Sequence, residues 1–247
     1  MTRTFSMALA ATAIALTPAC AQGQVDPADK KAVEKIVYEY IMENPEIIEE
    51  ALIALSEKRE AEEAALAMAA IADNQDALIN NLADYSVGPA DAPVTVVEFF
   101  DYRCGFCKRS AEWATELPAQ YDNQVRVVFK EFPILSTESE KAALAAIAAG
   151  KQDKYIEMHM ALMELDNGSG FGPEQIDAAA ESVGVDVTRM RADMKSIDVQ
   201  KTVADAKSLA RTLNITGTPN FIVGSEMVSG ADVQQVEAMI EAALADS

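Results

Sequence analysis

The sequence contains few residues that bind metal ions or form disulfide bonds: three cysteines and one histidine among 247 residues. A structural zinc site needs four ligands, and only Cys104, Cys107 and His159 supply a thiolate or an imidazole after position 20. We therefore expect no metal site. Basic residues are also scarce, since 20 lysines and arginines stand against 40 aspartates and glutamates, a formal net charge of −20. Such a chain repels phosphate backbones and anionic lipids, so nucleic acid is not expected as a partner.

Aromatic residues make up only 6% of the chain, although hydrophobic residues, many of them alanine, make up 50%. This composition excludes a disordered chain and indicates a globular protein that is rich in helix. The length allows one sizeable domain and a smaller appendage.

Residues 1–21 have the features of a secretory signal peptide: Arg3, an apolar stretch at 5–16, and small residues at the end. The apolar stretch is too short to span a bilayer. Cleavage after Ala21 would remove Cys20 with the signal. The alternative is cleavage in front of Cys20 followed by its lipidation. Either route predicts export to a compartment where disulfide bonds persist.

The cysteine pair Cys104 and Cys107 lies between a β-branched and aromatic run, 93–100, and a helix-forming segment, 108–120. The run predicts a buried strand, so the cysteines lie where a strand passes into a helix. The N–H groups and dipole of a helix N-terminus stabilise a thiolate, which makes Cys104 the expected nucleophile. Cys107 is the expected resolving cysteine, which attacks the mixed disulfide. The alternative is an inert disulfide, whose short loop constrains the unfolded chain little.

Residues 22–86 are expected to form a helical head and arm. Two apolar stripes recur in the head at helical spacing, and a polar segment follows at 56–63. Two short helices bury too little surface to be stable alone. The head must therefore pack on copies of itself, which the polar arm favours, or fold back onto the main domain. The stripes comprise Val33, Ile36, Val37, Tyr40, Ile41, Ile48, Ala51, Leu52 and Leu55.

Residues 87–245 are expected to form the redox domain, an α/β domain. A second strand at 125–132 completes a β-α-β unit with parallel strands. Residues 136–213 then have a helical pattern, and strands resume at 220–223 and 227–229 before a C-terminal helix. The order is that of a thioredoxin fold with helices inserted between its halves.

Residues 98–107, 130–134 and 217–221, together with the helical insertion, resemble the DsbA family of exported thiol-disulfide oxidoreductases. Residues 36–52 resemble the N-terminal segment of its ScsC branch, which is associated with suppression of copper sensitivity. The resemblance implies a periplasmic homotrimer that acts as a disulfide isomerase on exported proteins with cysteines. It also implies a membrane-bound reductase as partner and no cofactor besides the redox-active disulfide.

The resemblance implies further roles around the cysteines. Thr218 and Pro219 match a loop whose proline is cis in thioredoxin-like proteins and whose preceding residue binds the substrate strand. Gly105 and Phe106 are expected to contact substrate as well. Many DsbA-like oxidases carry a histidine at one of these two positions, so its absence argues against a strongly oxidising character.

Glu98 lies in a strand that should be covered on both faces, where burial raises the pKa of a carboxyl group. It matches the family's acidic residue, which would assist proton movement at Cys107, and Lys130 in the next strand is its expected partner. The alternative is a purely structural ion pair. His159 stands alone among apolar residues of a helix and is expected to be a packing residue.

Three functions remain open. The first is the oligomeric isomerase, and the second is a monomeric dithiol oxidase of the DsbA type. The third is a chaperone or a copper(I) carrier whose cysteines are ligands rather than catalysts.

Overall fold

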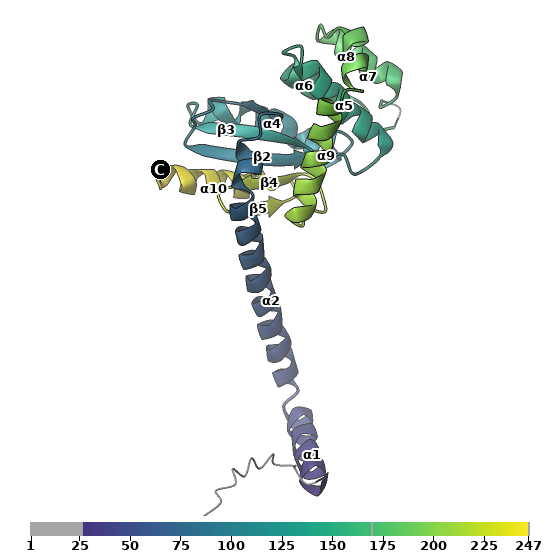
Figure 1. Cartoon of the computed structure of the whole chain (residues 1–247). Coiled ribbons are helices and arrows are strands. Elements are labelled where there is room, and N and C mark those ends of the chain that lie inside the picture. The colour runs from purple at the N-terminus through teal and green to yellow at the C-terminus, as the bar shows by residue number, and fades with distance from the viewer. Residues whose placement is uncertain (1–26, 169, 247) are drawn as a thin grey trace, which may run out of the picture. The chain divides into compact units, whose positions relative to one another are not determined.

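The computed structural model describes residues 27–168 and 170–246, which divide into two compact units with the boundary in sequence after Lys58 (Figure 1). Helix α1 covers Pro27–Glu43. Helix α2 covers Glu46–Asp73, so the boundary between the units falls inside it. The predicted signal peptide and Cys20 lie outside the described residues.

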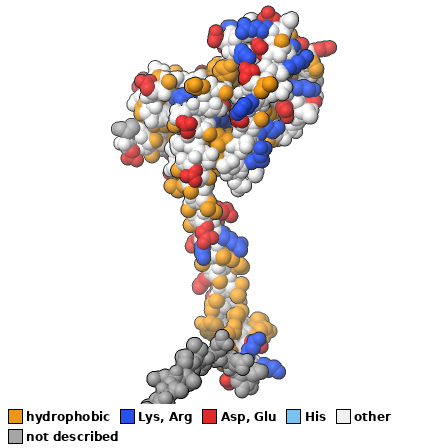
Figure 2. Space-filling model, viewed as in Figure 1, with side chains coloured by type: hydrophobic (Ala, Val, Ile, Leu, Met, Phe, Trp, Pro, Cys, Tyr) orange, Lys and Arg blue, Asp and Glu red, His pale blue; other side chains and the backbone are white. Residues whose placement is uncertain are grey.

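The first unit exposes its apolar stripes. Helix α1 ends just before Asn44 and Pro45, and the side-chain amide of Asn44 donates to the carbonyl of Tyr40 at 2.9 Å. Ile36 and Leu52 keep 64% and 61% of their surface in contact with solvent. Figure 2 shows hydrophobic side chains covering much of α1 and the first turns of α2. A single chain therefore provides no core for the head.

The second unit is built on a five-stranded sheet with the order β1-β3-β2-β4-β5. Only β2 and β3 run parallel, and the other pairs are antiparallel. Both faces of β2 and β3 are covered, which is why these strands read as continuous Val- and Phe-rich runs. The strands are Tyr85–Val87 (β1), Val94–Phe100 (β2), Val125–Glu131 (β3), Asn220–Val223 (β4) and Glu226–Ser229 (β5).

Helices cover the sheet in two layers. Apolar residues of α4 and α10 pack on one face, with the cysteines, and the helical insertion joins this cluster. The end of α2, α3 and part of α9 pack on the other face, where Ile71 and Leu78 are buried. These helices are α3 (Gln75–Ile79), α4 (Gly105–Gln120), α5 (Thr137–Gly150), α6 (Tyr155–Glu164), α7 (Pro173–Ser182), α8 (Val187–Asp193), α9 (Ile197–Thr212) and α10 (Val233–Ala245).

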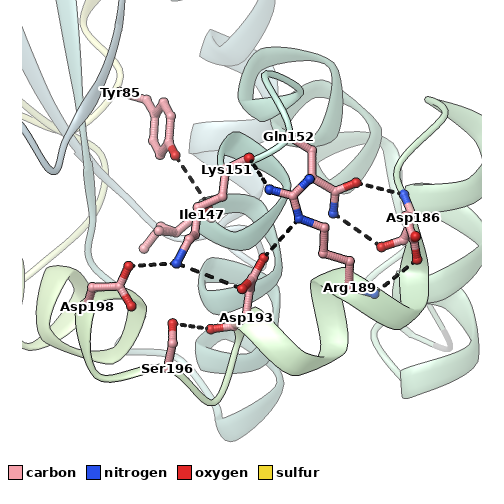
Figure 3. Close-up of polar contacts among 9 residues, drawn as sticks. All are labelled: Tyr85, Ile147, Lys151, Gln152, Asp186, Arg189, Asp193, Ser196 and Asp198. Atoms are coloured by element: carbon pink, nitrogen blue, oxygen red, sulfur yellow. Dashed lines mark hydrogen bonds and ion pairs between the residues drawn. The ribbon is translucent and has the colours of Figure 1, made fainter.

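Polar contacts hold the insertion together where α5 ends (Figure 3). The ammonium group of Lys151 lies 2.7 Å from the carboxylate of Asp198 at the start of α9. The carbonyl of Lys151 accepts a hydrogen bond from Arg189 of α8 at 2.9 Å. These contacts tie the end of α5 to α8 and to the start of α9 within the insertion.

Strand β1 is absent from the sequence-based prediction, which assigned residues 22–86 to the head and arm. Tyr85 stacks on Tyr155 with 4.2 Å between the ring centres, and its hydroxyl donates to the carbonyl of Ile147. Gly150 allows this approach, because a Cβ atom there would lie 2.1 Å from the ring of Tyr85. The contacts that fix the Tyr85 side chain thus come from residues more than 60 positions later in the chain.

Candidate active site

The two cysteines lie at the junction of β2 and α4. Cys104 is the N-cap residue of α4, with an extended backbone at φ −75° and ψ 115°. Its carbonyl accepts a hydrogen bond from the N–H of Lys108 at 3.0 Å, which starts the helix. Both cysteines are free thiols, and their exposed fractions are 7% for Cys104 and 0% for Cys107. Cys104 is therefore the more accessible sulfur, at the end of the helix where a negative charge is stabilised.

Asp101 fixes the turn between β2 and the cysteines. One carboxylate oxygen accepts hydrogen bonds from the N–H of Arg103 and the hydroxyl of Ser139, both at 2.7 Å. The other accepts from the N–H groups of Ile134 and Leu135 at 2.8 and 2.9 Å. The residue is almost fully buried. Its role is not apparent from the sequence, because three of these four donors come from a loop and a helix more than 30 positions later in the chain.

The loop before β4 completes the site from the other side. The Thr218–Pro219 peptide bond is cis, as the family resemblance implied. The carbonyl oxygen of Thr218 lies 3.2 Å from the Sγ atom of Cys104. The carbonyl of Pro219 accepts a hydrogen bond from the N–H of Gly230 at 2.9 Å, which ties the loop to the end of β5.

Hydrogen bonds lower the pKa of the Cys104 thiol to about 5, well below its ordinary range. The largest contribution comes from the thiol of Cys107, which stabilises the thiolate, and burial opposes it. Hydrogen bonds with Thr218 and with the N–H groups of Cys107 and Phe106 contribute as well. Cys104 is therefore a thiolate at neutral pH, which is the nucleophilic form.

Burial raises the pKa of Cys107, and its hydrogen bond to Cys104 and the charge of Glu98 raise it further. Burial also raises the pKa of Glu98 to about 8, with a smaller contribution from the negative charge of Cys104. Neither carboxyl oxygen of Glu98 has a hydrogen-bond partner among the described residues. The structure thus brings Glu98 to the cysteine pair as a protonated group at neutral pH.

The predicted ion pair between Glu98 and Lys130 is wrong. In the register of β2 and β3, Glu98 pairs with Phe129, whereas Lys130 pairs with Phe99. Because side chains alternate along a strand, Glu98 and Lys130 point to opposite faces of the sheet. The ammonium group of Lys130 instead forms a buried ion pair with Asp84 and donates to the carbonyl of Ala77 at 2.6 Å. Lys130 therefore does not reach the cysteines.

Gly105 and Phe106, which separate the cysteines, lie at the surface. The ring of Phe106 is 56% exposed and packs under the guanidinium group of Arg109, whose carbon lies 4.4 Å from the ring centre. A Cβ atom at Gly105 would meet only Arg109, at 3.9 Å. The approach to Cys104 from this side is open.

Lys108 joins the active-site helix to the insertion. Its ammonium group donates to the carbonyls of Met163 and Leu165, at 2.8 and 2.6 Å, and lies 4.9 Å from the ring centre of Phe171. This contact could not be predicted from the sequence, because the partners of Lys108 are backbone carbonyl groups at the end of α6, and these leave no pattern of residue types.

His159 is a packing residue, as predicted. It is fully buried, and burial lowers its pKa to about 3, so the ring is neutral. Its Nδ1 atom lies 3.2 Å from the hydroxyl of Tyr102. Tyr102 and Tyr155 both donate to one carboxyl oxygen of Glu131. Across the described ranges, the side chains of Cys, His, Asp and Glu form no group of three suited to a metal ion.

Known protein families match both parts of the chain. The DSBA-like thioredoxin domain matches residues 95–240, more than half of the sequence. The chain belongs to the DsbA-like thioredoxin family. The N-terminal domain of the copper resistance protein ScsC matches residues 29–62 of this DsbA-like chain. The predicted recognition of a DsbA-like protein of the ScsC type is thus confirmed, as is the thioredoxin fold with its helical insertion.

Solved structures of DsbA-like proteins support this assignment. A linker-deletion mutant of Proteus mirabilis ScsC, which also carries a point substitution, is 29% identical, with a TM-score of 0.67. The match covers 92% of this chain and 100% of that one. A thioredoxin-like oxidoreductase from Silicibacter pomeroyi is 35% identical, with a TM-score of 0.64, and the match covers 69% of this chain and 97% of that one.

Curated relatives fall into two groups. The probable disulfide bond formation protein D of Bacillus cereus is 28% identical over 158 residues, which cover 58% of this chain and 71% of that protein. The Na⁺/H⁺ antiporter NhaA 1 of Salinispora arenicola is 30% identical over 165 residues, 66% of this chain. The chain spans about a quarter of that antiporter's length.

The DsbA-like domain, with its pair of neighbouring thiols, is a thiol-disulfide oxidoreductase domain. No helix in the described part of the chain is both long enough and apolar enough to cross a membrane.

Proposed function

We propose that this DsbA-like chain is a periplasmic disulfide isomerase that assembles into a homotrimer through its N-terminal head. The observation that carries the proposal is the exposed pair of apolar stripes on α1 and α2. Tyr40 is 57% exposed and Val33 56%, in addition to Ile36 and Leu52. Buried apolar surface stabilises by roughly 25 cal/mol per Å², so stripes of this kind favour association. The similarity to Proteus mirabilis ScsC extends over the head and supports this reading.

In the proposed reaction the Cys104 thiolate attacks one sulfur of a wrong substrate disulfide. A bond forms between Cys104 and that sulfur, the substrate disulfide breaks, and the second substrate sulfur leaves as a thiolate. This thiolate attacks another disulfide of the same substrate. A substrate thiolate then displaces Cys104, so an isomerisation consumes no electrons.

Cys107 resolves mixed disulfides that do not rearrange. Its thiolate attacks the Sγ atom of Cys104, the substrate leaves as a thiol, and the enzyme is left with a disulfide that a membrane-bound reductase must reduce. Cys107 must lose a proton for this attack. We propose that Glu98 accepts this proton. The negative charge of Cys104 contributes to the raised pKa of Glu98, and this charge disappears once Cys104 has formed the mixed disulfide. The carboxyl group then ionises more readily when a proton acceptor is needed.

Assembly would serve isomerisation because several redox units around one substrate raise the local thiol concentration without any new contact. The backbone of Thr218, next to Cys104 in the cis-proline loop, would pair with the substrate strand, and Gly105 and Phe106 would border it.

Periplasmic location is part of the proposal and rests on the sequence of residues 1–21. Repair of proteins that have formed incorrect disulfide bonds under copper stress would connect this activity with the match to the ScsC N-terminal domain.

A matched pair of charged variants tests the proposal. Ile36→Asp with Leu52→Asp should give a folded monomer by analytical ultracentrifugation, because an apolar contact does not tolerate unpaired charge. Ala32→Asp with Ala54→Asp adds the same charge to the same helices outside the stripes and should leave the assembly intact. The monomer should still exchange small disulfides but lose most of its capacity to refold scrambled ribonuclease. A full-length protein that is monomeric at micromolar concentration would overturn the proposal.

The same refolding assay in excess copper(I) chelator separates catalysis from copper transport. Undiminished refolding would exclude a function in which the two thiols serve only as copper ligands.

The low pKa of Cys104 favours a second candidate, a dithiol oxidase. A stabilised thiolate stabilises the reduced enzyme and so makes its disulfide more oxidising. The reduction potential separates the two functions, since oxidases of this fold lie near about −120 mV and isomerases near about −180 mV. Equilibration of the protein with glutathione buffers, followed by alkylation and mass spectrometry, measures this potential.

A further inference from the structure

A groove of about 870 Å³ lies in the second unit, beside the cis-proline loop. The part of α2 that belongs to this unit forms one wall, with Leu66 and Met68. The opposite wall combines Thr218 and Pro219 with Met227 of β5. The volume falls within the range of ligand-binding pockets, about 300–1,000 Å³.

The groove is continuous with the cysteine site. Thr218 lines it and also places its carbonyl oxygen 3.2 Å from the Sγ atom of Cys104. The backbone N–H groups of Gly217 and Thr218 donate to no backbone acceptor within the described residues. A Cβ atom at Gly217 would meet nothing within 4 Å, so the loop has open space beside it. An extended chain disulfide-bonded to Cys104 would therefore run into the groove.

The α2 wall is apolar, exposed and firmly held. Leu66 is 71% exposed and Met68 is 47% exposed, although Ile71, one turn further on, is fully buried under the sheet. The Gln75 side chain after α2 also donates to the carbonyl of Gly224 at 3.1 Å. Methionine side chains, such as Met68 and Met227, adapt to ligands of different shape. The wall thus suits varied apolar side chains rather than one fixed partner.

The groove also carries negative charge. Glu63 on α2 and Glu226 on β5 line it from opposite sides, and both are exposed. No lysine, arginine or histidine belongs to its lining in this unit. Complementary charge on a ligand is positive.

We propose that this groove binds the polypeptide segment next to the substrate cysteine, and that Leu66 and Met68 select segments with apolar side chains flanked by lysine or arginine. The inference rests on the proposed thiol exchange at Cys104 and adds a substrate class to it. Leu66 and Met68 are specificity-determining residues, because they line the groove together with Thr218, whereas neither cysteine belongs to its lining.

The test measures how fast the reduced full-length protein reduces three small disulfides. The first is a peptide whose single cysteine is flanked by leucine and lysine and forms a disulfide with glutathione. The second is the same peptide with glutamate in place of lysine. The third is glutathione disulfide. Leu66→Ser with Met68→Ser should slow reaction with the lysine peptide about tenfold, which corresponds to about 1.4 kcal/mol. Reaction with glutathione disulfide should be unchanged. Leu82→Ser with Ile197→Ser removes two exposed apolar side chains outside the groove and should change neither rate.

Charge provides a second arm. Glu63→Lys with Glu226→Lys should reverse the preference between the lysine and glutamate peptides. Equal rates for all variants would overturn the inference, and so would an equal loss with glutathione disulfide, which would indicate an effect on Cys104 itself. A lower assembly mass for the Leu66→Ser and Met68→Ser variant would also overturn it, because the face would then pack on a second copy. A wild-type protein that prefers the lysine peptide but fails to refold scrambled ribonuclease would refute the isomerase and support the groove.

Discussion

Cys107 stabilises the thiolate of Cys104 through a hydrogen bond, and the same contact raises the pKa of Cys107 itself. One sulfur is thus ready to attack at neutral pH while its neighbour stays protonated. The pair divides into nucleophile and resolving thiol because one lies at the helix N-terminus and the other is fully buried.

The first prediction is that the Cys104 thiol titrates near pH 5 in the reduced protein. Ultraviolet absorbance of the thiolate measures the midpoint. Cys107→Ala should raise it, because the largest stabilising hydrogen bond is lost, whereas Cys107→Ser keeps a hydroxyl donor and should raise it less. A wild-type midpoint at or above about 8.5, the value of a free cysteine, would contradict the assignment.

The second prediction concerns trapped intermediates. Cys104→Ser should abolish thiol exchange, whereas Cys107→Ser should accumulate mixed disulfides, because the attack uses the first sulfur and the escape uses the second. Non-reducing electrophoresis after incubation with a disulfide-containing substrate shows both results. The roles are not as proposed if an alkylating reagent modifies both thiols of the wild-type protein at the same rate.

The third prediction is that Glu98→Gln stabilises the protein more as pH rises. The pKa of Glu98 is about 8 in the folded state and that of an exposed glutamate is about 4.5. The raised pKa favours folding below pH 4.5, and this contribution disappears as pH rises through 8. Urea unfolding of the reduced proteins should show no gain at pH 4 and a gain of roughly 3 to 5 kcal/mol at pH 8. Parallel stability curves for the two proteins would rule this out.

The fourth prediction separates stability from catalysis at Lys130. Lys130→Met leaves Asp84 without its partner in the interior and should cost roughly 3 to 5 kcal/mol of stability. Lys130→Met with Asp84→Leu should recover much of this loss, because neither charge then remains buried. The rate of glutathione disulfide reduction should be unchanged in the double variant. A fall in that rate would restore a catalytic role to Lys130.

Much of the architecture follows from patterns within short stretches of sequence. The apolar runs of β2 and β3 predict parallel strands covered on both faces, and the junction at Cys104 predicts a nucleophile at a helix N-terminus. It is harder to predict which face of the sheet each side chain points to. This depends on the register, that is, on which residue of β2 pairs with which residue of β3. With Val94 beside Val125, Glu98 is four positions further and Lys130 five, so the two differ in parity.

Asp84 and Asp101 show why other parts were not predicted. Each is an acidic residue with partners at least 30 positions away, which are Lys130 for Asp84 and residues 134–139 for Asp101. Nothing near these residues in sequence distinguishes a buried carboxylate from one that faces solvent. The assignment of Asp84 to a solvated arm followed from that ambiguity.

The distance in sequence between Asp101 and its partners, and between Cys104 and Thr218, has a consequence for the order of folding. The turn that carries Cys104 takes its shape only when residues 134–139 have reached Asp101, and the sulfur meets the cis-proline loop only when β4 has joined the sheet. A chain in which β4 has not joined the sheet lacks the contribution of Thr218 to the low pKa of Cys104, whereas the contributions of Cys107 and Phe106 are local. The full nucleophilic strength of Cys104 thus depends on the completed fold.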